Sequence, residues 1–98
     1  MDFNLDEMLA KEVSSNQLML DAANMARSMS AEERREIIGE CNKRIDFVFE
    51  EIKAIEKGRI FSELDEEEVK RDMALCNIGS RLDSILTAMM IPEEVLNY

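Results

Sequence analysis

The sequence contains no histidine and no tryptophan, and its aromatic side chains are four phenylalanines and one tyrosine. Without histidine, the commonest general base is missing, together with the usual partner of a nucleophilic cysteine and a frequent zinc ligand. The chain also lacks a glycine-rich phosphate loop and a nucleophile elbow. Scarce aromatic rings argue against single-stranded nucleic acid, whose bases stack on such rings. We therefore predict no enzyme activity, no catalytic residue, no metal site and no cofactor.

Basic residues are few relative to acidic ones: 12 lysines and arginines stand against 22 aspartates and glutamates, a net charge of −10. Binding along a phosphate backbone relies on excess positive charge, so we expect no direct nucleic-acid binding. An acidic surface most often serves solubility, although mimicry of nucleic acid is a second use of it. The run "ELDEEE" lacks the loop pattern of an EF-hand and is interpreted as a solvated helix start.

The chain has no long apolar run and no export signal. No stretch approaches the roughly 20 apolar residues of a membrane-spanning helix. The N-terminal "MDFNLDEM" has neither a basic region nor an apolar segment. We therefore expect a cytoplasmic protein without membrane contact, in which Cys41 and Cys76 stay reduced. Both thiols fall on apolar seams, which predicts that they are packed in the core.

What the chain has in quantity is material for amphipathic helices, with 46 % hydrophobic residues, eight methionines and no competing strand pattern. Residues 1–15 are predicted as an arm and residues 16–29 as a helix, with an N-cap at Ser15. The arm either docks in a groove of another molecule or covers the apolar face of this chain. The second alternative is favoured.

The clearest helix prediction covers residues 31–57. Ser30 and Glu33 form a capping box at its start, and Gly58 is placed to end it. Between them, apolar residues recur in steps of three and four, a heptad seam of the kind that packs knobs into holes. The seam consists of Ile38, Cys41, Ile45, Val48, Ile52 and Ile55, and is widened by Phe47 and Phe49.

A second long helix is predicted over residues 63–90, capped by Ser62 and ended by Pro92, with residues 91–98 as a C-terminal turn. Its seam comprises Val69, Met73, Leu75, Cys76, Ile78, Leu82, Ile85 and Met89. A short connection between two amphipathic helices makes an antiparallel hairpin. The predicted fold is all-α, a single domain of residues 1–98 with a long hairpin and an N-terminal helix. Its seams are wider than one partner helix covers, so we expect self-association to complete a bundle.

Gly79 is the least expected residue of the second helix, since glycine in a helix interior costs roughly 1 kcal/mol relative to alanine. If the hairpin turns near residue 60, Gly39 lies level with Gly79, and both allow a close approach of two backbones or of a ligand. The candidate contact or ligand cleft comprises Arg35, Gly39, Asn42, Asn77, Gly79, Arg81 and Ser84. Three interpretations stay open: a close helix crossing, which is favoured, a subunit contact, and a small-ligand pocket.

The segment from "RSMSAEERREI" through "LTAMMIP", about residues 27–92, resembles the helical-hairpin cyclic-nucleotide sponges that phages use against CBASS immunity. The likeness rests on the helix start "S-x-E-E", the hairpin, and a methionine-containing helix that ends before a proline. The arginine-rich, aromatic stretch of the family's last helix is not matched by "ALCNIGSRLDSIL", so no binding residue is carried over. The resemblance implies a homo-oligomer that sequesters a signalling nucleotide.

The leading functional hypothesis is a small acidic helical protein without enzyme activity. It would self-associate into a homo-oligomer and bind another protein, as an inhibitor or adaptor, and the resemblance suggests phage origin and an anti-defence role. One alternative is an oligomeric sponge that sequesters a cyclic-nucleotide immune signal, and a second is a nucleic-acid mimic.

Overall fold

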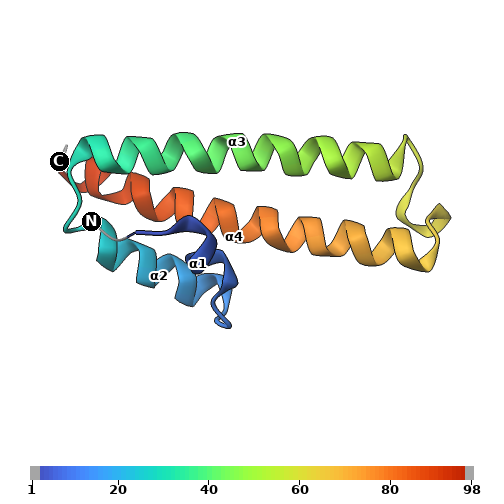
Figure 1. Cartoon of the computed structure of the whole chain (residues 1–98), viewed down its shortest axis with the longest axis horizontal. Coiled ribbons are helices and arrows are strands. Elements are labelled where there is room, and N and C mark those ends of the chain that lie inside the picture. Colours follow the sequence, from blue (N-terminus) through green and yellow to red (C-terminus); the bar gives the residue numbers. More distant parts are fainter. Residues whose placement is uncertain (1–2, 97–98) are drawn as a thin grey trace.

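The computed structural model describes residues 3–96, with side chains placed for residues 3–91. This part of the chain is all-α, as predicted, and contains no strand (Figure 1). In order, its elements are α1 (Leu5–Ala10), α2 (Ser15–Ala26), α3 (Ala31–Glu56), the short 3-10 turn η1 (Phe61–Glu63) and α4 (Glu66–Leu96).

The helix starts are set by side chains that accept hydrogen bonds from the first unpaired backbone N–H groups. The predicted capping box is confirmed. The Glu33 N–H donates to Ser30 Oγ and the Ser30 N–H donates to Glu33 Oε1, each over 3.1 Å. At α2 the cap is Ser14, one residue before the predicted Ser15, and its Oγ accepts from the Gln17 N–H over 3.1 Å.

The connection between α3 and α4 is longer than predicted. α3 ends where Lys57 and Gly58 adopt left-handed conformations, with φ of 48° and 77°, so the predicted stop at Gly58 is confirmed. The predicted cap Ser62 is wrong, because Ser62 lies inside η1. Asp65 caps α4 instead. Asp65 Oδ1 accepts from the Glu68 N–H over 2.8 Å, and Glu68 Oε1 accepts from the Asp65 N–H over 3.1 Å, which completes a second capping box.

α4 continues to Leu96, so the prediction that Pro92 ends the helix is wrong. Proline lacks the N–H that would bond to the carbonyl four residues earlier. The loss is one backbone bond near the end of a 31-residue helix, and the backbone stays helical across it. Of the predicted C-terminal turn, residues 91–96 belong to α4, and residues 97 and 98 lie outside the described residues.

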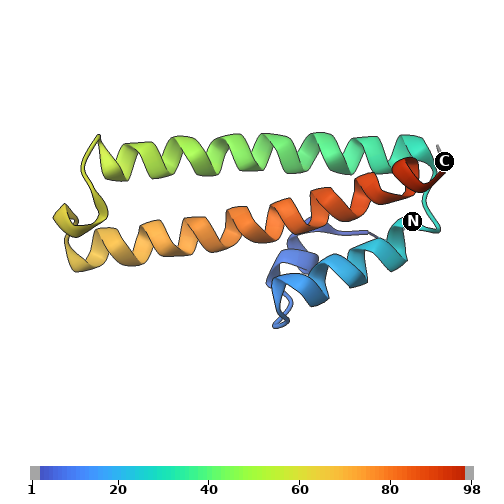
Figure 2. The same cartoon turned by 180° about the vertical axis from the view of Figure 1, so that it is seen from behind.

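α4 is the central helix of the fold (Figure 1, Figure 2). α3 runs antiparallel along one side of it, and α2 packs on another side, against the half that leads to the C-terminal end. α1 contacts α4 next to α2. The hairpin end near residues 57–65 therefore consists of two helices and their connection, at one end of a body 47 Å long. Side chains at that end have fewer neighbours to cover them.

The core follows the predicted seam of α3. Its residues form two rows with a spacing of seven: Cys41, Val48 and Ile55 are buried, and Ile38, Ile45 and Ile52 are half-buried. The main buried contributions from α4 are Leu82, Ile85 and Met89, and those from α2 are Leu18, Ala22 and Ala26. Full burial of a leucine- or isoleucine-sized side chain contributes roughly 1.5–3 kcal/mol. The interior therefore rests on α4 and its two flanking helices.

Three residues of the predicted α4 seam are exposed, namely Met73, Cys76 and Ile78. Met73 is 60 % exposed and Ile78 is 41 % exposed, whereas Asp72 is only 2 % exposed. Met73 lies in the half of α4 that has α3 as its main neighbour, so among the described helices no other one covers the side of α4 that is turned away from α3 (Figure 1). Across the described helices, none combines the length and the apolar character that crossing a bilayer requires.

Candidate functional site

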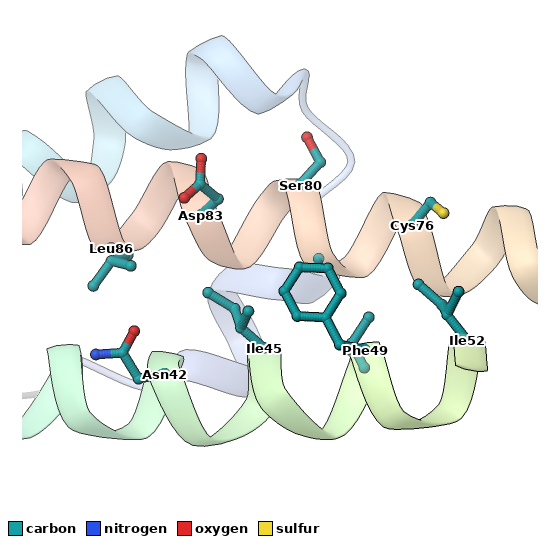
Figure 3. A pocket seen from close by; sticks show the side chains of 10 residues that line it. Asn42, Ile45, Phe49, Ile52, Cys76, Ser80, Asp83 and Leu86 are labelled. Atoms are coloured by element: carbon teal, nitrogen blue, oxygen red, sulfur yellow. The ribbon is translucent and has the colours of Figure 1, made fainter. Parts of the chain in front are cut away.

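Between α3 and α4 lies a groove of about 410 Å³ with a mostly apolar lining, termed here the α3–α4 groove (Figure 3). Figure 3 shows Phe49 projecting between the two helices, with Asn42 and Leu86 towards one end and Ile52 and Cys76 towards the other. The lining residues are Asn42, Ile45, Val48, Phe49 and Ile52 from α3, and Cys76, Gly79, Ser80, Asp83 and Leu86 from α4.

Both walls of the groove share one residue spacing. Steps of three, four and three connect Asn42, Ile45, Phe49 and Ile52 on α3, and the same steps connect Cys76, Gly79, Asp83 and Leu86 on α4. Such steps place side chains on one face of a helix, as in the seams of helix bundles. α1 lies behind the groove in Figure 3, and Phe49 is 57 % exposed. The groove is therefore a double seam with an open side.

α1 covers part of the opposite side of α3 and α4. Leu5 and Met8 are buried in the core, so the predicted arm covers the apolar face of its own chain, the alternative that the sequence favoured. Asp6 forms an ion pair with Arg44 of α3 over 2.5 Å. The hydrogen bond between these two side chains is the main reason why the pKa of Asp6 is lowered and the pKa of Arg44 is raised.

Arg81 holds the connection between α1 and α2 in place. It is 9 % exposed, and its guanidinium donates to the carbonyls of Leu9 (3.2 Å), Lys11 (2.5 Å) and Val13 (2.8 Å). Carbonyls at and beyond a helix C-terminus have no helical partner, and a buried arginine supplies five donors for them. Arg81 was a predicted site residue, and the structure gives it this anchoring contact on the side away from the groove.

The seven predicted site residues are not brought together. Asn42 and Gly79 line the α3–α4 groove, Asn77 and Arg81 face the hollow beside α1, and Arg35 and Gly39 are exposed on α3. Ser84 Oγ donates to the Ser80 carbonyl one turn earlier on the same helix, over 3.1 Å. The predicted cleft is therefore split between two separate concave surfaces, each with two of its members.

The predicted pairing of Gly39 with Gly79 is wrong. A Cβ atom at Gly79 would lie 3.5 Å from Val48 Cγ1, which is ordinary van der Waals contact. Around a Cβ atom at Gly39, no atom of the described residues lies within 4 Å, apart from its two chain neighbours and the nearby backbone of the same helix. Gly79 lies opposite Val48 across the hairpin. The reason is that η1 lengthens the connection and moves the midpoint of the hairpin past residue 60.

The two cysteines differ in their burial. Cys41 is buried, as predicted, and burial raises the pKa of its thiol to about 11. Cys76 is exposed, so its predicted place in the core is wrong. Its pKa is also raised, by desolvation first and then by the hydrogen bond that it donates to Asp72. Both shifts disfavour the thiolate, and a nucleophilic cysteine needs the opposite.

Asp72 is a buried acid that the sequence analysis missed. Its Oδ1 accepts from Cys76 Sγ over 3.4 Å, and its Oδ2 has no hydrogen-bond partner among the described residues. It also neighbours Glu56 of α3, whose pKa is raised mainly by hydrogen bonding to Asp72, then by burial and repulsion. The sequence does contain a signal for the burial of Asp72. Residues 72, 75, 79 and 82 follow steps of three and four along the face of α4 that meets α3.

The α3–α4 groove offers apolar contact, a few polar atoms and one carboxylate, that of Asp83. Such a surface suits the apolar face of a helix. Within the described part of the chain, no group of three or more histidine, cysteine, aspartate or glutamate side chains is arranged to hold a metal ion. Comparisons of the chain with protein families, curated proteins and solved structures give no match.

Proposed function

We propose that this chain is a non-enzymatic interaction protein that self-associates through the α3–α4 groove and also binds another protein. The observation that carries the proposal is the open double seam, in which Phe49 remains 57 % exposed between Ile45 and Ile52. Burial of apolar surface is favourable by roughly 25 cal/mol per Å². A second helical hairpin laid on this face would complete a four-helix bundle, the usual way to close two such seams.

The charges beside the groove favour a second copy of the chain as the occupant. Asp46 lies three residues before Phe49 and Lys53 lies four residues after it, both exposed. If two α3 helices cross antiparallel at Phe49, each Asp46 meets Lys53 of the other copy, as a two-fold interface requires. Among the described residues, Lys53 forms one ion pair, in which its Nζ lies 3.5 Å from Glu50 Oε1. Its side chain is 75 % exposed, so it can change partners.

The α4 wall also permits this approach. Gly79 stands at the level of Val48, with Ser80 beside it, so the groove is lined there by small side chains. Small residues let helices of two subunits come close, while the large Phe49 fills the space on the neighbouring wall. The polar Asn42 within the seam is the kind of residue that fixes the register of a bundle.

A nucleotide sponge receives less support from the same surface. Phosphate groups need positive partners, and the charged residue that lines the groove is Asp83. On the other side of the hairpin, Arg44 is bonded to Asp6 and Glu40, and Arg81 is bonded to three backbone carbonyls. The groove thus favours an apolar protein surface over a cyclic nucleotide as its ligand.

The test uses two phenylalanines on α3. Phe49→Glu places a charge in the groove, whereas Phe47→Glu changes a residue that is 63 % exposed and does not line it. In sedimentation velocity at high micromolar concentration, we expect the wild-type chain and Phe47→Glu to associate and Phe49→Glu to be monomeric, with equal helix content. A monomeric wild-type chain, or equal loss of association in both variants, contradicts the proposal.

A charge exchange tests the arrangement of the two copies. Asp46→Lys should weaken association, because it sets two positive side chains against each other, and Asp46→Lys with Lys53→Asp should restore it. A cyclic dinucleotide should leave the melting temperature unchanged. A large rise would instead favour the sponge, since a ligand that binds only the folded state stabilises it.

A further inference from the structure

The connection between the two long helices presents apolar side chains to solvent. Ile60 is 64 % exposed and Phe61 is 51 % exposed, although Leu64, three residues further on, is buried. These residues lie at the end of the hairpin that is distant from α1 and α2 (Figure 1). The connection is thus anchored by one apolar residue and leaves two others uncovered.

The connection is also braced in one conformation. The guanidinium of Arg59 donates to the carbonyls of Ile55 (2.6 Å) and Glu56 (3.1 Å). It also donates to both carboxylate oxygens of Glu68, over 3.2 and 2.6 Å. This ion pair lowers the pKa of Glu68, mainly through the hydrogen bond from Arg59. Bidentate pairs of this kind fix geometry as well as adding energy, so Ile60 and Phe61 are presented by a rigid frame.

The surroundings of the two side chains are acidic. Between residues 57 and 68 the chain has five acidic and two basic side chains, and Arg59 is already paired with Glu68. Lys70 approaches Glu66 and Glu67 to only 3.7 and 3.9 Å, and all three side chains are well exposed. Such exposed pairs neutralise little charge in water. The exposed carboxylates around the tip are Glu63, Asp65, Glu66 and Glu67.

We propose that this hairpin tip, Ile60 and Phe61 with the four carboxylates around them, is the docking surface for a partner protein with an apolar pocket rimmed by lysine and arginine. The partner's chemistry follows from complementarity of charge around an apolar anchor. A rigid frame reduces the ordering cost of binding. An anionic membrane would repel the carboxylates, and two tips of the same charge repel each other. In naming this chemistry the inference rests on the proposed protein-binding function, but it uses a surface separate from the α3–α4 groove.

The experiment uses a displayed library of random peptides as the probe. Peptides are selected on the immobilised wild-type chain and counter-selected on the double variant Ile60→Ser and Phe61→Ser. Both side chains are exposed, so the double variant should keep its helix content by circular dichroism. We expect peptides with leucine, phenylalanine or tryptophan flanked by lysine and arginine. Peptides without a basic bias, or no enrichment over the double variant, overturn the proposal.

Affinity measurements on an enriched peptide complete the test. Binding should fall at least about tenfold with Phe61→Ser, the size of effect typical of an interface anchor. It should weaken as salt increases and with Glu63→Gln, Glu66→Gln and Glu67→Gln combined, because the charges are exposed. The control Phe47→Ser should bind like the wild-type chain, and an equal loss there contradicts the proposal. Phe49→Glu should also bind normally, so failure of the groove and failure of the tip are seen separately.

Discussion

Cys76 Sγ lies 3.4 Å from Asp72 Oδ1, one helical turn away on α4, at the place where Glu56 approaches from α3. No basic side chain bonds to Asp72 among the described residues, and its Oδ2 is unpartnered. One turn nearer the hairpin tip, by contrast, Glu68 is neutralised by Arg59. Two acids and a thiol thus meet without a counter-charge, which makes this contact a weak point between the long helices.

Glu56→Gln should stabilise the chain at neutral pH and have little effect in acid. The pKa of Glu56 is raised above its ordinary 4.5 in the folded protein, so the folded state holds this proton more tightly than the unfolded state. The associated stability is present below 4.5 and is lost as pH rises through the raised pKa. The unfolding free energy of the variant relative to the wild-type chain should therefore grow as the pH rises from 4.5 through the raised pKa of Glu56, and then level off.

Urea unfolding of the wild-type chain and Glu56→Gln between pH 3 and 7 checks this. Some carboxylates, such as Asp6, Glu33 and Glu68, have a lowered pKa, and the stability that they contribute is lost in acid. This loss is the same in both proteins, so it cancels in the difference between their unfolding free energies. Glu50→Gln serves as control, because Glu50 is exposed. A constant difference between pH 3 and 7 would mean that Asp72 does not influence the ionisation of Glu56.

The two thiols should react at different rates with a thiol reagent under native conditions. Cys76 is exposed and should be labelled first, limited mainly by its raised pKa. Cys41 is fully buried and should be labelled only when the helices open. Mass spectrometry of the single variants Cys41→Ser and Cys76→Ser follows each site. Fast labelling of Cys41 in the folded chain would contradict the described core.

Arg81→Met should detach α1 while leaving the long helices formed. Methionine keeps much of the apolar stem but removes the donors to the carbonyls of Leu9, Lys11 and Val13. Hydrogen bonds from a charged group contribute roughly 1.5–3 kcal/mol each, but water can bond to the freed carbonyls in the variant. We therefore expect the unfolding free energy to fall by about 2–4 kcal/mol. Hydrogen exchange should increase in residues 5–13 first. The exposed Arg71→Met on the same helix should change neither quantity.

The sequence predicts best what depends on local spacing. The capping box of Ser30 and Glu33 and the buried row through Val48 follow from patterns within a few residues, and the structure confirms them. The burial of Asp72 in place of Met73 does not follow from the pattern of apolar residue types, because it depends on which positions of α4 face α3. The register of the hairpin was also missed, since η1 adds length that no local pattern revealed.

Alanine substitutions at Gly39 and Gly79 distinguish contacts within one chain from contacts between two copies. From sequence alone, alanine at either Gly39 or Gly79 is expected to lower the melting temperature or weaken association. The structure reverses the expectation for Gly39, because a methyl group there meets open space. Gly39→Ala should stabilise the chain by roughly 0.5–1 kcal/mol, through helix propensity and a less flexible unfolded state.

Gly79→Ala should have two opposite effects. Within one chain its Cβ would contact Val48 Cγ1 at 3.5 Å without a clash, so the unfolding free energy of the monomer should rise as for Gly39→Ala. In the α3–α4 groove, however, the methyl group occupies the small-residue wall that a second copy approaches, and association should weaken. Chemical unfolding at low concentration and sedimentation at high concentration measure the two effects separately. Tighter association in Gly79→Ala would show that the second copy does not pack closely on α4, since a close contact cannot accept the added methyl group without moving apart.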